Sequence, residues 1–349
     1  MSQIMGAAIL GTGDVSGEHI KAFERNPHTE VRAILSRDRA KAEAKAAQYG
    51  LANCRAYTSL DELLKSDDIH VVSVCTPHNL HVEQGVACAE SGRHVVMEKP
   101  VAIELAGLHA LDAAIRKAGV RSVVSFVLRW NPLYENIKAM IADGLVGDLF
   151  YGEVNYYHHI DKRYSVYPWM KQTALGGSTL LAGGCHAVDG LRWFMQGDAV
   201  EVCGYSTTSK GNPLEYEYDP SVVILVKFAD GRIGKVGSSF ECVLPYWFNL
   251  LLMGNQGTIR NNEVFTKRWP GQTNWAAIPT ILPDSGAVTH HPFNAQIDHF
   301  VACILEGRES HCNVADAVKT HEICMAGDIS AREGKPVKLP LEAPRAHSA

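Results

Sequence analysis

Residues 4–17 read IMGAAILGTGDVSG and decide the fold of the first part of this chain. The apolar run from Ile4 to Leu10 is typical of a buried strand, and a helical pattern follows the glycines and continues to about Phe23. Gly11 permits a tight turn and Gly13 lets a phosphate approach the backbone, while the helix N-terminus offers free N–H groups. The order of strand, glycine turn and helix predicts a dinucleotide site.

The residues expected to contact that dinucleotide at the turn are Gly11, Gly13, Asp14 and Val15. The third small position is occupied by Ser16 or Gly17, which is not a strict match to the usual glycine pattern.

Apolar strands and helices alternate from Ile4 to about Phe126. We expect strands at 4–10, 31–35, 71–75, 95–97 and 122–126, and further helices at 38–49, 79–91 and 103–117. Such alternation predicts a parallel sheet with helices on both faces, an α/β Rossmann domain over residues 1–126.

The character of the chain changes after Arg129. We expect helices at 132–143, 294–306 and 314–332, and strands at 150–158, 200–205, 222–228, 233–240, 247–253 and 258–260. These long strands predict an α+β domain over 127–349 with a large, open, mainly antiparallel sheet. Because one face of such a sheet lacks its own helices, we expect a homo-oligomer, a dimer or tetramer, built on that face.

Composition is that of an ordinary soluble globular protein, with 46% hydrophobic and 20% charged residues in 349. The net charge of −5 without a basic stripe excludes nucleic acid and membrane as expected partners. The first strand is expected to begin within three residues of Met1, so we expect no signal peptide. Nine scattered cysteines without a CxxC motif suit buried thiols, so we expect a cytoplasmic protein.

Glu98-Lys99-Pro100 directly follows the strand-like run 93–97. A lysine at the end of a parallel strand stands where open α/β sheets bind ligands. In a partly desolvated cleft its ammonium can act as a proton shuttle. The alternative is an exposed loop lysine beside a helix-starting proline.

Two further motifs are Thr76-Pro77-His78-Asn79-Leu80-His81 and Gly183-Gly184-Cys185-His186-Ala187-Val188-Asp189, and residues 330–337 read SAREGKPV. Together with the glycine turn and Glu98-Lys99-Pro100, they form a pattern from Ile4 to about Pro340 that resembles the Gfo/Idh/MocA family of oxidoreductases. The resemblance implies that the nicotinamide half of the cofactor is lined by Thr76, Pro77, Asn79, His81, Glu98 and Lys99.

The same resemblance implies the catalytic residues. Lys99 would touch the nicotinamide ribose and the substrate hydroxyl, and His186 would act on that hydroxyl as general acid and base. Asp189, one helical turn on, would face the same cleft, and Arg129 would border the substrate pocket.

The chain departs from the family pattern at Ala182, where many sugar and polyol dehydrogenases carry an aspartate four residues before the histidine. The carboxylate expected to orient or tune His186 is therefore absent from that position. Asp189 is one substitute, and the others are Tyr157, His158 and Asp161.

Ser36-Arg37-Asp38 ends the second expected strand, where an acidic residue would bind the ribose of NAD. Ser36 with Arg37 suits the 2′-phosphate and favours NADP. In the alternative, Arg37 stacks on the adenine of NAD and Asp38 caps the next helix.

The segment 155–164 reads NYYHHIDKRY and combines aromatic faces with hydrogen-bonding groups, which suits a sugar ring. Tyr157 and His158 are therefore expected at the substrate, although a subunit contact explains the segment equally well. The histidine pairs 78/81, 158/159 and 290/291 lack a compact ligand spacing, so no metal is expected.

These observations predict an NAD(P)-dependent dehydrogenase that acts on a secondary alcohol of a sugar, polyol or inositol. One alternative is a glycosidase or lyase that retains its nicotinamide and shows no net redox change, because Ala182 departs from the dehydrogenase pattern. Another is a cofactor-binding regulator without catalysis, which the presence of both Lys99 and His186 disfavours.

Overall fold

The computed structural model describes residues 4–280 and 290–342, and the chain divides into two compact units. The first unit comprises Met1–Val127 and Pro292–Val318, and the second comprises Leu128–His291 and Lys319–Ala349. Contacts thus group 292–318 with the first unit, whereas the expected division at 126/127 placed this segment in the second domain. The exact domain limits stay a prediction.

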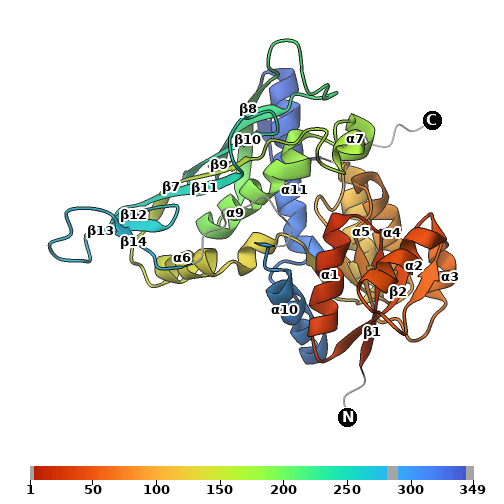
Figure 1. Cartoon of the computed structure of the whole chain (residues 1–349). Coiled ribbons are helices and arrows are strands. Elements are labelled where there is room, and N and C mark those ends of the chain that lie inside the picture. Colours follow the sequence, from red (N-terminus) through yellow and green to blue (C-terminus); the bar gives the residue numbers. More distant parts are fainter. Residues whose placement is uncertain (1–3, 281–289, 343–349) are drawn as a thin grey trace. The chain divides into compact units, whose positions relative to one another are not determined.

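A six-stranded parallel sheet forms the centre of the first unit, in the order β3-β2-β1-β4-β5-β6; its strands β1 and β2 are labelled in Figure 1. Its strands are β1 (Met5–Leu10), β2 (Thr29–Leu35), β3 (Arg55–Tyr57), β4 (Val71–Val74), β5 (His94–Met97) and β6 (Ser122–Val124). The order reverses between β1 and β4, and ligands of such sheets bind at the carboxyl ends of the strands beside this point. The predicted Rossmann architecture is confirmed.

Helices cover this sheet, and α1 packs against α10 from the late part of the chain. The ring centroids of His19 on α1 and Phe293 on α10 lie 5.0 Å apart. The helices are α1 (Asp14–Arg25), α2 (Arg39–Gln48), α3 (Leu60–Leu64), α4 (His81–Glu90), α5 (Leu105–Ala118) and α10 (Phe293–Glu306), with a 3-10 turn η1 (His78–Leu80). The short β3 and α3 were not predicted, because neither is long enough to show a clear periodicity.

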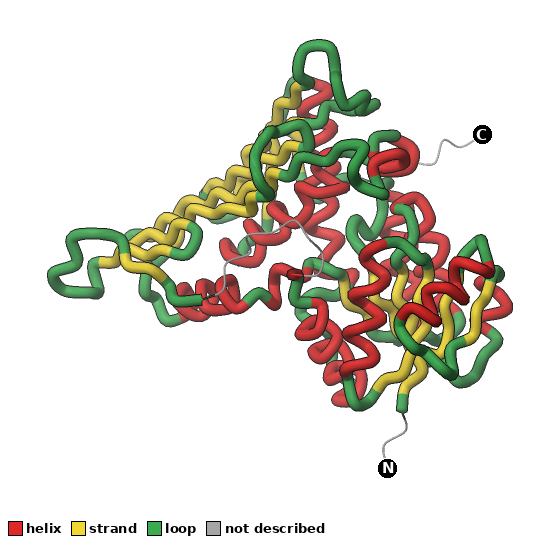
Figure 2. Tube along the Cα trace, in the orientation of Figure 1, coloured by secondary structure: helices red, strands yellow, loops and turns green. Residues whose placement is uncertain are grey.

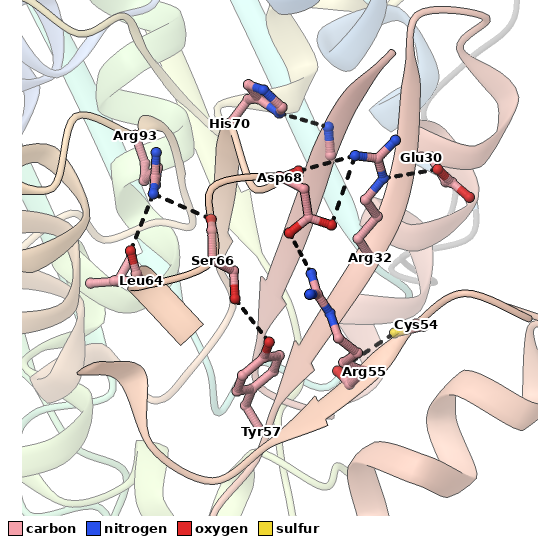
Figure 3. A network of polar contacts seen from close by, with 11 residues as sticks. Glu30, Arg32, Cys54, Arg55, Tyr57, Leu64, Ser66, Asp68, His70 and Arg93 are labelled. Atoms are coloured by element: carbon pink, nitrogen blue, oxygen red, sulfur yellow. Dashed lines mark hydrogen bonds and ion pairs between the residues drawn. The ribbon is translucent and has the colours of Figure 1, made fainter. Parts of the chain in front are cut away.

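A polar network closes the amino ends of these strands (Figure 3). Asp68, just before β4, bonds Arg55 on β3 at 2.6 Å and lies 3.8 Å from Arg32 on β2. The hydrogen bond from Arg55 lowers the pKa of Asp68. His70 accepts a hydrogen bond from the Gly6 backbone at 3.0 Å. Ion pairs therefore stabilise the amino ends of these strands. The carboxyl ends, where such sheets bind ligands, lie at the opposite edge.

The second unit contains a nine-stranded sheet in the order β14-β13-β12-β11-β7-β10-β9-β8-β15, drawn in yellow in Figure 2. All neighbours are antiparallel except β7 and β10. Its strands are β7 (Leu149–Tyr157), β8 (Ala199–Thr207), β9 (Ser221–Phe228), β10 (Ile233–Ser239), β11 (Trp247–Gly254), β12 (Gly257–Arg260), β13 (Glu263–Thr266), β14 (Ala276–Ala277) and β15 (Val337–Lys338). The predicted, mainly antiparallel sheet is confirmed.

Helices pack on one face of this sheet. The glycines at 152 on β7 and 234 on β10 leave room for Leu191 of α9, since a Cβ at either would lie 3.0 Å or less from that side chain. The helices of this unit are α6 (Pro132–Ala142), α7 (Tyr167–Met170), α8 (Thr173–Gly176), the π-helical turn η3 (Leu180–Gly184), α9 (Cys185–Met195) and, from Lys319 on, α11 (Val314–Glu333); η2 (Val127–Trp130) spans the boundary between the two units.

The other face of the sheet exposes large apolar side chains. They are Tyr205, Val223, Leu225, Ile233 and Trp247, which are 44–73% exposed. In the described part of the chain, no helix is both long and apolar enough to cross a membrane.

Candidate active site

The glycine turn after β1 has the geometry expected of a phosphate-binding loop. Gly11 has a φ of +102°, and a Cβ there would lie 2.6 Å from the carbonyl oxygen of Cys75, so only glycine fits. Gly13 caps α1 without a side-chain hydrogen bond, and its Cβ position has no atom within 4 Å. Helix α1 begins at Asp14, followed by Val15, and its first backbone N–H groups lie next to the open space beside Gly13. These residues fit the pyrophosphate of a dinucleotide.

Ser36 and Arg37 follow β2 at the same edge of the sheet. Ser36 is half-buried and Arg37 is exposed. Asp38 accepts a hydrogen bond from the backbone of Ala40 at 3.0 Å and caps α2, as the alternative interpretation of this segment expected. Asp38 is therefore engaged in capping, and the contact of Ser36 and Arg37 with an adenine ribose stays a prediction.

His81 joins two of the predicted motifs. Its Nε2 lies 2.7 Å from the carbonyl oxygen of Thr76 and its Nδ1 lies 2.7 Å from that of Pro100. Burial lowers the pKa of His81 despite these two carbonyls. Pro77 precedes the turn η1 and Asn79 lies within it. The segments after β4 and β5, both predicted to contact the nicotinamide, therefore both lie against one buried imidazole.

A second buried histidine, His19, holds the Glu-Lys-Pro motif. Its Nε2 lies 2.9 Å from Glu98 Oε1, and its Nδ1 lies 2.8 Å from Ser73 Oγ. The other carboxylate oxygen, Oε2, accepts a hydrogen bond from the backbone N–H of Lys99 at 3.2 Å. The backbone of the expected proton shuttle is thus fixed from the helix that begins at the glycine turn.

The charges in this network oppose the effect of burial. Burial would lower the pKa of His19, but interactions with Cys75 and Glu98 raise it to about 10. Burial would raise the pKa of Glu98, but His19 and Lys99 lower it. The two side chains therefore form a buried ion pair. Sequence reasoning missed His19, whose only signal is a histidine on the inner face of the first helix.

In the second unit, His186 is the second residue of α9. The preceding π-helical turn can lie close to the sheet because residue 183 is a glycine. A Cβ at this position would lie 2.6 Å from Phe240 and 2.7 Å from Tyr156. His186 is 7% exposed, and its ring lies nearly parallel to that of Tyr156, with centroids 5.7 Å apart and an interplanar angle of 22°. The chain therefore presents this histidine over a strand of the sheet.

Four rings, Tyr156, His158, Tyr164 and Tyr246, form what we call the aromatic cluster. Tyr156 Oη lies 3.1 Å from His158 Nδ1, and His158 Nε2 lies 3.0 Å from Tyr164 Oη. Tyr246 stands edge-on to both Tyr156 and His158, at 5.6 and 5.3 Å between centroids. Burial raises the pKa of Tyr156 and of Tyr246, so both phenols remain protonated.

Tyr157 lies elsewhere. It stands next to Tyr156 on β7 and so points to the opposite face of the sheet, where its ring centroid lies 6.1 Å from that of Trp247. The structure thus brings His158, and not Tyr157, into the neighbourhood of His186. The prediction missed Tyr156 and Tyr246, although the run of aromatic residues and the alternation of a strand were a signal for the former.

Arg129 and Asp189 form a buried, bidentate ion pair. Arg129 Nε donates to Asp189 Oδ2 at 2.8 Å and Nη2 donates to Oδ1 at 2.5 Å, while Thr320 donates to Oδ1 at 3.3 Å. Both side chains are at most 4% exposed. Two predicted site residues therefore meet, and the contact anchors α9, which carries His186.

Among residues 4–280 and 290–342, no group of three or more metal-ligating side chains is arranged to hold an ion. No disulfide joins the cysteines of the described residues. His159 lies 3.4 Å from Asp161, which also binds Arg163.

This strand order, with a glycine turn after the first strand and a separate α+β unit, defines a class of protein: a dinucleotide-binding oxidoreductase with a second domain. Comparison with known families agrees. Residues 5–126 match the model of an oxidoreductase family with an NAD-binding Rossmann fold, and residues 134–260 match the GFO/IDH/MocA C-terminal domain. The chain belongs to the Gfo/Idh/MocA family, as the resemblance implied.

Several relatives are dehydrogenases. The trans-1,2-dihydrobenzene-1,2-diol dehydrogenase of Xenopus tropicalis is 29% identical over 254 residues, covering 72% of this chain and 73% of its own. The D-apiose dehydrogenase of Paraburkholderia graminis is 26% identical and covers 95% and 89%. The solved structure of a levoglucosan dehydrogenase shares the fold with a TM-score of 0.87 at 22% identity, covering 97% of this chain and 100% of that one.

Proposed function

We propose that this protein is an NAD(P)-dependent dehydrogenase that oxidises a secondary alcohol of a sugar, polyol or inositol, or reduces the matching ketone. The observation that carries the proposal is the placement of Lys99 at the end of β5, with its backbone N–H held by Glu98, in the same unit as the glycine turn. Relatives named as dehydrogenases of a diol and of a sugar support the substrate class.

The nicotinamide, when bound, supplies or accepts the hydride. Gly11, Gly13 and the N-terminus of α1 hold the pyrophosphate, because their N–H groups and open backbone suit an anion. Lys99 and His186 are the groups that hold and move the hydroxyl proton.

NADP is the proposed cofactor in preference to NAD. Ser36 and Arg37 stand at the diagnostic end of β2, where a hydroxyl and a guanidinium suit a 2′-phosphate. Asp38, the one carboxylate in this tripeptide, is engaged in capping α2.

Tyr246 supports a substrate rich in oxygen atoms. Its hydroxyl is buried and has no hydrogen-bond partner among the described residues. A buried donor of this kind costs about 1–3 kcal/mol, which an oxygen of a bound substrate would offset. Its position beside Tyr156 and His158 makes it the proposed donor to a substrate hydroxyl.

A homo-oligomer is also part of the proposal. The exposed face of the nine-stranded sheet carries the large apolar side chains Tyr205, Val223, Leu225, Ile233 and Trp247, which are 44–73% exposed in a single copy. A second copy presenting the same face would cover it.

The deciding experiment follows absorbance at 340 nm with NAD and NADP separately, over a panel of sugars, inositols and glycosides, with mass spectrometry of the products. Reduction of free cofactor by one substrate class supports a dehydrogenase. Cleavage of a glycoside without net reduction would replace the proposal with the redox-assisted glycosidase.

Lys99→Ala tests the assigned lysine in the same assay. We expect turnover to fall by about 10²- to 10⁴-fold while cofactor binding, followed by fluorescence, stays largely intact. Lys117→Ala, an exposed lysine at the end of α5, is the matched control. Unchanged turnover in Lys99→Ala would remove Lys99 from the mechanism.

A further inference from the structure

The ring of His186 is held against a strand of its own unit. His186 belongs to α9 and Tyr156 to β7, and two glycines allow the helix to approach this close. A Cβ at Gly183 would lie 2.7 Å from Tyr156, and one at Gly190 would lie 3.2 Å from Phe248. The backbone on either side of His186 is therefore packed against the rings of Tyr156 and Phe248, and the ring planes of His186 and Tyr156 lie 22° apart.

Tyr156 is itself fixed by hydrogen bonds. Its hydroxyl bonds His158 Nδ1, and His158 Nε2 bonds the hydroxyl of Tyr164. Because both nitrogens of His158 are engaged, its ring has one orientation. The backbone N–H of His158 also donates to Ser239 at 3.0 Å, which continues the pairing of β7 with β10. Tyr246 closes the side of the cluster by standing edge-on to Tyr156 and His158.

The acidic residues that the sequence offered as partners of His186 are bound by cations. Both carboxylate oxygens of Asp189 accept hydrogen bonds from Arg129. Asp161 binds Arg163 through Oδ1 and lies next to His159 through Oδ2. The position four residues before His186 holds Ala182, which has no carboxylate to offer.

We propose that the aromatic cluster orients the imidazole of His186, with Tyr156 as the ring it rests on and His158 and Tyr164 as the hydrogen-bonded support behind it. The cluster thereby does the work of the carboxylate that is absent at Ala182. Tyr156, His158 and Tyr164 are positioning residues in this account, and it rests on the proposed role of His186 in proton transfer.

The test compares three variants of the full chain with a matched control. Tyr156→Leu removes the ring, while Tyr156→Phe and His158→Phe keep a ring and remove only hydrogen bonds. Tyr151→Phe is the control, because Tyr151 lies on the same strand and also loses one phenol hydrogen bond, to Glu153 at 3.1 Å.

The first readout needs no turnover. The ring ¹⁵N and ¹H signals of His186, assigned by their loss in His186→Gln, report its tautomer and its orientation in the unliganded protein. We expect them to move in Tyr156→Leu, to move less in Tyr156→Phe and His158→Phe, and to stay in place in Tyr151→Phe. Signals of His186 that are unchanged in all three variants would overturn the inference.

The second readout separates positioning from stability. We expect kcat to fall by about 10- to 100-fold in Tyr156→Leu, with the KM for cofactor unchanged, because a misplaced acid or base slows the chemical step. If Tyr156→Leu does not fold, Tyr156→Phe and His158→Phe decide, since both conserve a ring in the core. The two proposals can fail separately. If the His186 signals shift in the variants but the wild type turns over no substrate, the proposed function is wrong and the orientation of His186 by the cluster is still supported.

Discussion

The imidazole Nε2 of His19 lies 2.9 Å from Oε1 of Glu98, and both side chains are buried within the first unit. This ion pair links the helix that begins at the glycine turn to the strand end that carries Lys99. This contact thus connects the helix that follows the glycine turn with the segment that carries Lys99, and no local pattern in the sequence predicts it.

The pair predicts a stability that depends on pH. The pKa of His19 is raised from 6.5 to about 10 in the folded protein, so its contribution is complete below pH 6.5 and is lost as pH rises toward 10. The pKa of Glu98 is lowered, so its contribution is lost only as pH falls below the usual value of 4.5.

We therefore expect the free energy of unfolding of the wild type to fall between pH 7 and 10, by at most about 1.4 kcal/mol per pH unit, and the melting temperature to fall with it. His19→Gln should melt lower at pH 6 and show a flatter profile over that interval. The control is His290→Gln, an exposed histidine. Parallel profiles for wild type and His19→Gln would show that the ion pair does not contribute.

Gly13→Val tests the phosphate cradle. A Cβ at Gly13 meets no atom within 4 Å, so the variant should fold with a melting temperature close to that of the wild type. Its branched side chain would stand where a pyrophosphate must approach, and we expect cofactor affinity to fall at least about tenfold. Calorimetric titration with NAD and NADP measures this. Unaltered affinity for both would place the cofactor elsewhere.

Cofactor choice is tested at the end of β2. Arg37→Ala should raise the Kd for NADP by about tenfold, or about 1.4 kcal/mol, and change the Kd for NAD much less, because only NADP carries the 2′-phosphate. Ser36→Asp should reverse the preference by offering a carboxylate to the ribose hydroxyls. Equal losses for both cofactors in Arg37→Ala would favour the alternative, in which Arg37 stacks on adenine.

Tyr246→Phe removes one hydroxyl without removing a ring. Since that hydroxyl has no partner among the described residues, the variant should be as stable as the wild type or more so. If the hydroxyl donates to the substrate, the KM for substrate should rise by about 5- to 10-fold, a loss of about 1 kcal/mol, while the KM for cofactor stays the same. If the KM for substrate of Tyr246→Phe equals that of the wild type, the proposed contact is wrong.

Leu225→Lys tests the open face of the sheet. Leu225 is 50% exposed and lies in the middle of β9, so a lysine there should be tolerated in a monomer. In an assembly that buries this face, an unpaired charge would be costly and would lower the mass seen by light scattering. Lys227→Leu, two residues along the same strand, checks that the charge is responsible. An unaffected oligomer, or a monomeric wild type, would show that copies do not meet on this face.

Local patterns in the sequence were enough to predict the longer helices and strands and their order, but not short elements such as β3 and α3. The apolar run 4–10 with its glycines, the alternation up to Phe126 and the β-branched runs after Arg129 depend on neighbours within a few residues, and the structure places each strand and helix close to the expected limits. The parallel pairing of β7 with β10 was not foreseen, because strand neighbours far apart in the chain leave no periodic signal.

The sequence by itself therefore determined the two kinds of sheet, the glycine turn, the family and the candidates Lys99 and His186, since these lie in contiguous motifs. Only the tertiary structure decided what surrounds them. His19 meets Glu98 across 79 positions, Arg129 meets Asp189 across 60, and His186 rests on Tyr156. The physical reason is that a buried charge or ring interacts with the groups that tertiary packing brings next to it. These groups can lie far away in the sequence, so local patterns do not predict them.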